Sequence, residues 1–114
     1  MGRFLKLEDA PDYVPPGHSK VLDKVLVDRN TVGAENVVVW YGYLEPEAEA
    51  AEHIHSGSEQ VYFIIKGKIR FEIDGETIIG VPNSVTFVPQ GSRHAVKVLD
   101  EKAEMLVITA PPAR

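Results

Sequence analysis

The sequence contains no cysteine, so disulfide bridges, thiolate metal sites and cysteine nucleophiles are all excluded. It also lacks any apolar run long enough to cross a bilayer. Its first ten residues, MGRFLKLEDA, lack the apolar segment of a signal peptide. We therefore expect a cytoplasmic protein that has no membrane partner.

Basic residues are outnumbered by acidic ones. Lys and Arg total 12 and Asp and Glu total 17, which gives a net charge of −5. This balance argues against a nucleic acid or an anionic membrane surface as the partner. At 114 residues, with 44% hydrophobic and 25% charged residues, the chain has the size and composition of one soluble domain, residues 1–114.

Prolines and glycines divide the chain into short β-prone pieces. Residues 1–20 are turn-rich and predict an extended N-terminal arm. Further on, KIRFEIDGETIIG alternates cleanly, and its Asp74-Gly75 pair is a strong hairpin signal. Several short strands at regular spacing predict an all-β sandwich or small barrel.

The tract EPEAEAAEHIH, residues 45–55, consists largely of good helix formers. Pro46 opens it and a Ser-Gly-Ser turn follows it closely, which leaves little length for a helix. A helix would also turn His53 and His55 about 200° apart, since each residue advances by about 100°. We predict a loop that runs into a strand.

On a strand, His53 and His55 share one face, with Cα atoms about 6.6 Å apart. Two imidazoles so placed can bind one metal ion at about 2.1 Å each. Such a pair alone is weak evidence, because it is common on wet strand faces. A third histidine, His94, follows a Pro89 and Gly91 turn at the start of another strand, which strengthens the metal-site interpretation.

With these features the sequence resembles the cupin superfamily, whose motifs read G-x5-H-x-H-x(3 or 4)-E-x6-G and G-x5-P-x-G-x2-H-x3-N. The first corresponds to EAEAAEHIHSGSEQVYFIIKG from Glu47, and the second to NSVTFVPQGSRHAVKV from Asn83. The resemblance covers residues 36–108. It implies a double-stranded β-helix, or jelly-roll barrel, that holds a divalent metal ion: Fe, Mn, Ni, Co or Zn.

Three positions depart from these motifs: Glu47 and Asn83 replace glycines, and Val98 replaces an asparagine. At the acidic ligand, counting back from Gly67 by the family's six-residue spacer gives Gln60 rather than Glu59. The alternation of side chains along a strand also favours Gln60, because the side chain at position 59 points to the face opposite that of position 60. The resemblance therefore implies a metal site of His53, His55, Gln60 and His94. Glu59 remains an alternative, because a carboxylate is the commoner oxygen ligand.

Further residues receive predicted roles. Tyr62 shares the face of Gln60 and is a candidate catalytic acid, although a buried tyrosine with one satisfied hydroxyl is the alternative. His18 lies in the proline-rich arm and is interpreted as a surface residue. Arg93, at a predicted rim, would attract an anionic substrate. Trp40 and Tyr41 point to opposite faces of one strand, and the sequence leaves open which of them faces inward.

These features favour a metal-dependent enzyme that acts on a small oxygen-rich or anionic metabolite. The resemblance implies dioxygenase, isomerase or lyase-type chemistry and does not choose among them. The alternative is a non-catalytic binding or sensor module for a small ligand. The resemblance also implies a homodimer formed by sheet extension. Its crossing segment would be KVLDKVLV, residues 20–27.

Overall fold

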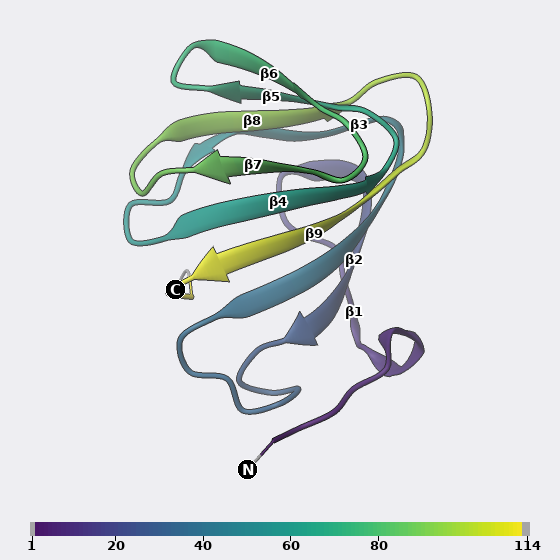
Figure 1. The fold of residues 1–114 in the computed structure, drawn as a ribbon, viewed down its shortest axis with the longest axis vertical. Helices are drawn as coiled ribbons and strands as arrows, with labels where there is room; N and C mark the ends of the chain where they lie inside the picture. The colour runs from purple at the N-terminus through teal and green to yellow at the C-terminus, as the bar shows by residue number, and fades with distance from the viewer. Residues whose placement is uncertain (1, 113–114) are drawn as a thin grey trace.

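The computed structural model describes residues 2–112, except for the side chains of residues 51 and 53. These residues form one short 3-10 helix, η1, and a series of strands (Figure 1). No helix in this described part is long and apolar enough to cross a membrane. The elements are η1 (Leu7–Asp9), β1 (Asp12–Tyr13), β2 (His18–Val27), β3 (Val38–Ile54), β4 (Glu59–Lys66), β5 (Ile69–Ile73), β6 (Glu76–Gly80), β7 (Ser84–Val88), β8 (Arg93–Val98) and β9 (Ala103–Ala110).

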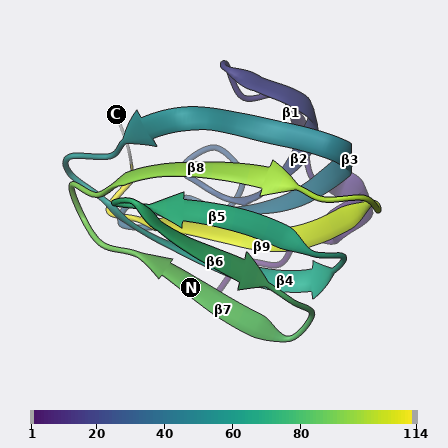
Figure 2. The same cartoon turned by 90° about the horizontal axis from the view of Figure 1, so that it is seen from above.

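The strands form one antiparallel sheet in the order β6-β5-β8-β3-β9-β4-β7, and β2 pairs with both β3 and β1. The sheet curls, so β3 and β7 lie on opposite sides of the fold (Figure 2). The two ends of this order, β6 and β7, also touch each other, which makes the barrel nearly closed. The predicted all-β barrel is therefore confirmed.

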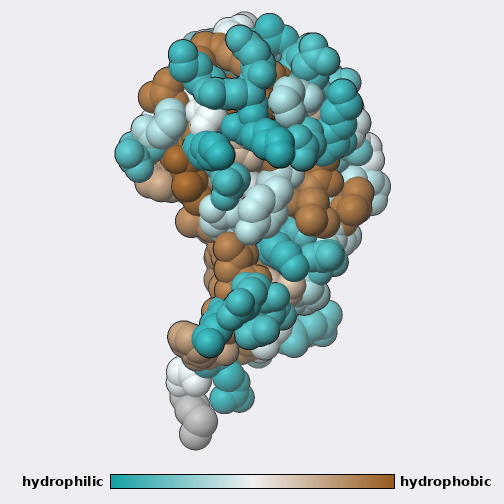
Figure 3. Space-filling model, turned by 90° about the vertical axis from the view of Figure 1, so that its right-hand side faces the viewer, coloured by the Kyte–Doolittle hydropathy of each residue, from teal (hydrophilic) through white to brown (hydrophobic). Residues whose placement is uncertain are grey.

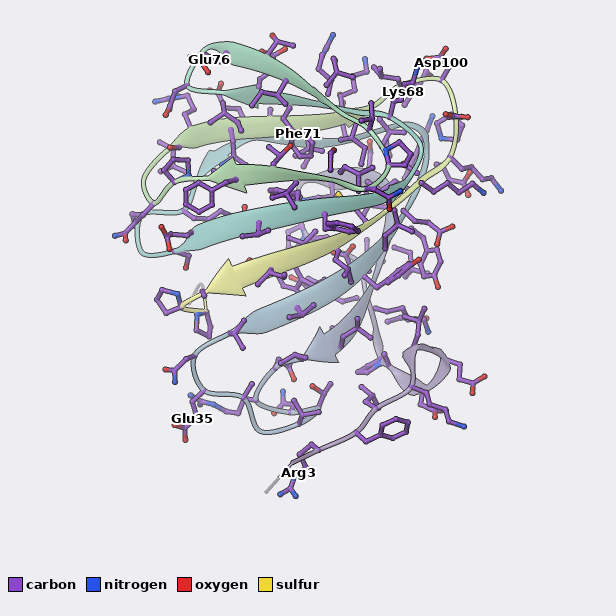
Figure 4. All side chains as sticks on the ribbon, viewed as in Figure 1. Arg3, Glu35, Lys68, Phe71, Glu76 and Asp100 are labelled. Carbon is purple, nitrogen blue, oxygen red and sulfur yellow. The ribbon has the colours of Figure 1, made fainter. Side chains whose placement is uncertain are left out.

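The core follows the alternation that the sequence predicts. Ile69, Phe71 and Ile73 on β5 are all buried. Figure 4 shows Phe71 within the curled sheet, while Lys68 and Glu76 lie at its periphery. Burying one large apolar side chain contributes about 1.5–3 kcal/mol to folding. On the face in Figure 3, hydrophilic side chains cover much of the broad upper end of the molecule.

The hairpin prediction is also confirmed. Asp74 and Gly75 connect β5 to β6, with φ values of 47° and 86°. Two successive positive φ angles are what a type I′ turn requires, and this turn matches the natural twist of the paired strands.

The predicted loop at residues 45–55 is wrong, because β3 continues as one strand to Ile54. β2 runs along one side of β3, and the partner on the other side changes from β9 to β8. The alternation of exposed Glu47 and Glu49 with buried Ala48 and Ala50 is the strand signal that helix propensity concealed.

A β-bulge lies between Ala50 and His53, where the pairing of β3 with β8 shifts register. Ala50 and His55 both line the barrel interior although they are five positions apart. An odd separation puts two strand residues on opposite faces unless one extra residue intervenes. The bulge therefore restores the inward direction of His55.

The two positions where the motifs carry glycine adopt glycine-like backbone angles here. Glu47 has φ of 65° and Asn83 has φ of 66°. Glutamate in this region costs about 1 kcal/mol, whereas asparagine tolerates it better. At Gly67, where φ is 82°, a Cβ would lie 2.6 Å from the Lys102 carbonyl oxygen, so glycine is required.

Candidate functional site

A cavity of about 570 Å³ opens into the barrel, which is a typical size for a small-molecule site. Most of its wall is apolar, and its polar lining residues include Asp23, His55, Gln60 and Tyr62. A second hollow of about 380 Å³ lies against η1 and Tyr43. The internal cavity is the better candidate, because His55, Gln60 and Tyr62 line it, whereas no predicted site residue lines the second hollow.

His55 lines this cavity, and the ring of His94 lies beside the His55 ring. Their ring centroids lie 5.4 Å apart, with an angle of 34° between the ring planes. His94 is only 1% exposed, and its Nδ1 lies 3.3 Å from the Ser92 carbonyl oxygen. This contact favours a proton on Nδ1, so the lone pair is on Nε2.

The side chain of His53 lies outside the described residues. Its main chain belongs to β3, where its Cα pairs with that of His94 on β8. Within the side chains that the structure describes, no cluster of three His, Cys, Asp or Glu residues forms a metal site.

Gln60 is buried in the cavity at 3% exposure, whereas Glu59 is exposed. This agrees with the expectation, from the spacer before Gly67, that Gln60 faces the site and Glu59 faces away from it. Gln60 Nε2 donates a hydrogen bond to Thr109 Oγ1 at 3.0 Å, and Gln60 Oε1 accepts one from the Tyr62 hydroxyl at 2.9 Å. An amide oxygen has two lone pairs, so this arrangement orients the amide and leaves acceptor capacity on its oxygen.

Tyr62 is buried, and its ring packs against Phe71 with centroids 5.1 Å apart. Burial raises the pKa of its hydroxyl, and the charge of Asp23 raises that pKa further. The hydroxyl is therefore a weaker acid than a tyrosine in water. Its hydrogen bond to Gln60 fits the alternative role, a satisfied hydroxyl that orients its neighbour.

Asp23 is the site residue that sequence reasoning missed. It is 5% exposed and lines the cavity, and burial raises its pKa from 3.8 to about 7. A signal was present: in the segment KVLDKVLV, Asp23 occupies the inward phase between Val21 and Val25. Aspartate is rarely buried without a partner, so its place in an apolar alternation marks an unusual site.

The N-terminal arm forms part of the cavity wall. The Tyr13 ring stacks on Trp40, with centroids 6.0 Å apart and an interplanar angle of 24°. Trp40 packs against the core, which answers the question of which face points inward. The interpretation of His18 as a surface residue is wrong, because it is half-buried and lines the cavity. The preceding residues of the arm, Pro15 to Gly17, also line the cavity, and His18 Nδ1 lies 3.0 Å from the Pro16 carbonyl oxygen.

Arg93 is exposed and forms an ion pair with Glu52, with Nη1 and Oε1 3.0 Å apart. Glu52 lines the cavity, so this pair lies at its rim. Because the glutamate compensates the charge, the attraction of Arg93 for an anionic substrate is reduced. The role predicted for Arg93 stays a prediction.

The curled sheet and its internal cavity define a small jelly-roll barrel with histidines at a largely apolar pocket. A family model described as the cupin domain matches residues 40–109, so the chain belongs to the cupin family. This finding confirms the resemblance inferred from the two motifs.

Comparisons with individual proteins agree. Polyketide synthase CurC of Streptomyces cyaneus is 29% identical over 91 residues, which cover 79% of this chain and 59% of that protein. The structure of KdgF from Halomonas sp. superposes with a TM-score of 0.83 and 17% identity, covering 98% and 96% of the two chains. The structure of the polyketide cyclase RemF from Streptomyces resistomycificus superposes with a TM-score of 0.82 and 21% identity, and the match covers 100% of this chain and 84% of that chain. The chain thus spans about three fifths of the curated relative, and the structural likenesses concern the fold.

Proposed function

We propose that this protein is a metal-dependent enzyme whose divalent ion is held by His53, His55, His94 and Gln60. The observation that carries the proposal is the pairing of the His55 and His94 rings at a cavity that also contains the buried Gln60. Because β3 and β8 pair at His53 and His94, the backbone of the remaining histidine lies beside the same site.

The ring spacing fits a shared ion. An imidazole bound at about 2.1 Å has its centroid about 3.2 Å from the metal, so two such rings lie at most about 6.4 Å apart. The 5.4 Å between His55 and His94 falls within this limit. Neutral imidazoles and a neutral amide would leave the ion its full positive charge, so a bound ion would supply strong polarisation of an oxygen-rich substrate.

The cavity wall indicates a substrate with an apolar body. Trp40, Leu44 and Met105 line the cavity beside the polar groups. A very small polar acid would leave these apolar surfaces in contact with water, whereas a flat carbon skeleton would cover them. Two similar proteins are named for polyketides, which carry closely spaced oxygens on such skeletons. We therefore propose a substrate that combines a chelating pair of oxygens with an aromatic or other apolar body.

In this proposal the chain's own residues bind and orient. The Tyr62 hydroxyl fixes the Gln60 amide from one side and Thr109 fixes it from the other. Tyr13 and Trp40 form an aromatic wall against which a planar skeleton can stack. These contacts hold the oxygens of the substrate at the polar part of the cavity and exclude water from its body.

The test is metal content, measured by plasma mass spectrometry on purified wild-type protein and on variants. We expect about one divalent ion per chain, lost in His94→Ala and in His55→Ala. Gln60→Glu should retain the ion and bind it more tightly, because it adds a charged ligand. Glu59→Gln is the matched control, since this side chain is exposed and should not affect binding. Wild-type protein that binds no divalent ion would refute the proposal.

The second candidate is the non-catalytic binding module. It would hold a small ligand, with or without metal, and it differs from the enzyme because it would leave that ligand chemically unchanged. The buried, titratable Asp23 in the cavity favours the enzyme, because proton transfer needs such a group.

We also propose a homodimer. Residues 20–27, the expected crossing segment, lie in β2 and pair with β3 of the same chain along most of their length. Another surface suits association: Val85 and Phe87 on β7 are 59% and 47% exposed, and they pair with Phe63 and Val61 on β4. Light scattering after size exclusion measures the mass, and a monomer that persists at high concentration would contradict the dimer.

A further inference from the structure

Asp23 is a buried residue of the largely apolar cavity wall. Val21 and Val25, which share the face of Asp23 on β2, are also buried. On the adjacent strands it pairs with Tyr13 of β1 and Gly42 of β3. A Cβ at position 42 would lie 3.1 Å from Asp23 Oδ1, so the glycine makes room for the carboxyl group.

Among the described side chains, no cationic group forms an ion pair with Asp23 that would explain its burial. The adjacent Lys24 pairs with Asp12 and donates to the Ala10 carbonyl oxygen, away from the cavity. Among the side chains that the structure describes, none forms an ion pair with Asp23 or donates a hydrogen bond to it. A buried carboxyl group without such partners destabilises the fold when it is ionised, so its presence calls for another reason.

Burial raises the pKa of Asp23 to about 7, so both of its protonation states are populated near neutral pH. A group with this property can both accept and return a proton during one reaction cycle. Perturbed carboxyl groups in clefts are typical of proton-transfer sites, and here the cavity supplies the geometry as well.

The other ionisable groups of the described cavity are less suited. Glu52 is exposed and paired with Arg93, Tyr62 has an even higher pKa, and Tyr13 is at the exposed rim. His55 is assigned to the metal in the proposed function. His18 lies in the arm and contacts the Pro16 carbonyl oxygen.

We propose that Asp23 is the catalytic base of this cavity and that its substrate is an aromatic or otherwise apolar ketone with an acidic C–H bond beside a second oxygen. This inference rests on the proposed function, because the metal would bind the two oxygens of such a substrate. It adds the residue that moves the proton and the bond that is broken.

The step balances as a proton transfer. The Asp23 carboxylate accepts the proton of the C–H bond, and the electron pair of that bond becomes part of the enolate of the substrate. Asp23 is then neutral. It returns the proton to the same carbon, which regenerates the substrate, or to the adjacent carbon. The second outcome is an isomerisation, in which the hydroxyl proton on the second oxygen passes to the former carbonyl oxygen, so that a new carbonyl group forms at the carbon that lost its proton.

The test uses 2-hydroxy-1-phenylethanone, which combines a phenyl ring, two adjacent oxygens and an acidic methylene group. The full-length protein is incubated with this probe in D₂O, and proton NMR follows the loss of the methylene signal. Three proteins are compared: wild type, Asp23→Asn, and Asp100→Asn as the matched control, since Asp100 is exposed in the loop before β9. Metal content is measured on all three samples.

We expect wild type and the control to accelerate exchange equally, with a rate that rises with pH through about 7 because the ionised carboxylate is the base. Asp23→Asn should retain metal and bind the probe, yet lose at least about 100-fold in rate together with this pH dependence. If wild type does not accelerate exchange, or if the variant matches it, the assignment of Asp23 is overturned.

The two proposals fail in different ways. Protein without metal that still shows Asp23-dependent exchange would refute the metal-dependent function and retain the base. Metal-loaded protein whose exchange rate is the same with and without the Asp23 carboxylate would refute Asp23 as the base and retain the metal-dependent function. Should Asp23→Asn fail to fold, carbon NMR of wild-type protein labelled at the aspartate carboxyl carbons decides instead. One carboxyl signal must titrate near pH 7 and shift when the probe binds, and the absence of such a signal overturns the proposal.

Discussion

Replacing Asp23 by asparagine should stabilise the metal-free protein at neutral pH, and the gain should depend on pH. Asparagine has nearly the shape of aspartate but carries no charge. In the folded protein burial raises the pKa of Asp23 to about 7, whereas its ordinary value is 3.8. Below pH 3.8 the carboxyl group is protonated in both folded and unfolded chains, and it then adds no pH-dependent penalty.

Between these two pH values the unfolded chain releases the proton while the folded chain retains it. The free energy of unfolding therefore falls as pH rises, by about 1.4 kcal/mol for each pH unit. Over the pH range from 3.8 to about 7, the free energy of unfolding falls by about 4 kcal/mol in total. Above this range Asp23 causes no further fall. Asp23 is 5% exposed, so screening by solvent removes little of this effect.

Denaturant unfolding followed by the fluorescence of Trp40, the single tryptophan, measures this free energy. Wild type and Asp23→Asn are compared from pH 5 to 8 in the presence of a chelator, because a bound metal would add its own pH dependence. The difference between the two proteins isolates Asp23, since the other carboxyl groups titrate equally in both. A difference that does not change with pH would refute the reasoning.

Further outcomes are expected from other sites. Glu47→Gly should raise the free energy of unfolding by about 1 kcal/mol in denaturant titrations, because glycine removes the strain of φ at 65°; an unchanged or lowered value would contradict this. Gly67→Ala should lower it by about 3 kcal/mol, since the added Cβ would lie 2.6 Å from a carbonyl oxygen; a loss below about 1 kcal/mol would count against the clash. Tyr62→Phe should cost about 1 kcal/mol of stability and weaken metal binding in titration calorimetry, because it leaves the Gln60 amide oxygen without its donor. Zn²⁺ or Mn²⁺ should raise the melting temperature of wild type in calorimetric scans but not that of His94→Ala, and an equal rise in both would argue against His94 as a ligand.

Much of the fold could be predicted from local pattern. The two-residue period and the Asp74-Gly75 turn determine the β5–β6 hairpin, and the same period distinguishes buried Gln60 from exposed Glu59. Residues 45–55 could not be assigned in this way. Their alanines and glutamates favour helix locally, and it is pairing with β2 and β8, both distant in sequence, that makes them a strand.

In the candidate site, too, some residues could be predicted from local pattern and others could not. His55, Gln60 and His94 belong to motifs with fixed spacing, so the sequence identified them. Asp23 belongs to no motif, and its role depends on a cavity that the folded chain creates. His18 was misjudged for a related reason, because only the folded arm brings it to the cavity wall.

The weak attachment of the N-terminal arm affects how ligands enter and leave the cavity. β1 contains only two residues, and the Asp12–Lys24 ion pair and the Tyr13–Trp40 stack help to hold it at the cavity entrance. An exposed ion pair contributes at most about 1 kcal/mol and weakens in salt. The entrance should therefore open many times for each global unfolding event, as a gate with a low barrier. Raising the ionic strength should then speed both the entry and the escape of an uncharged ligand, while the ratio of the two rates changes little.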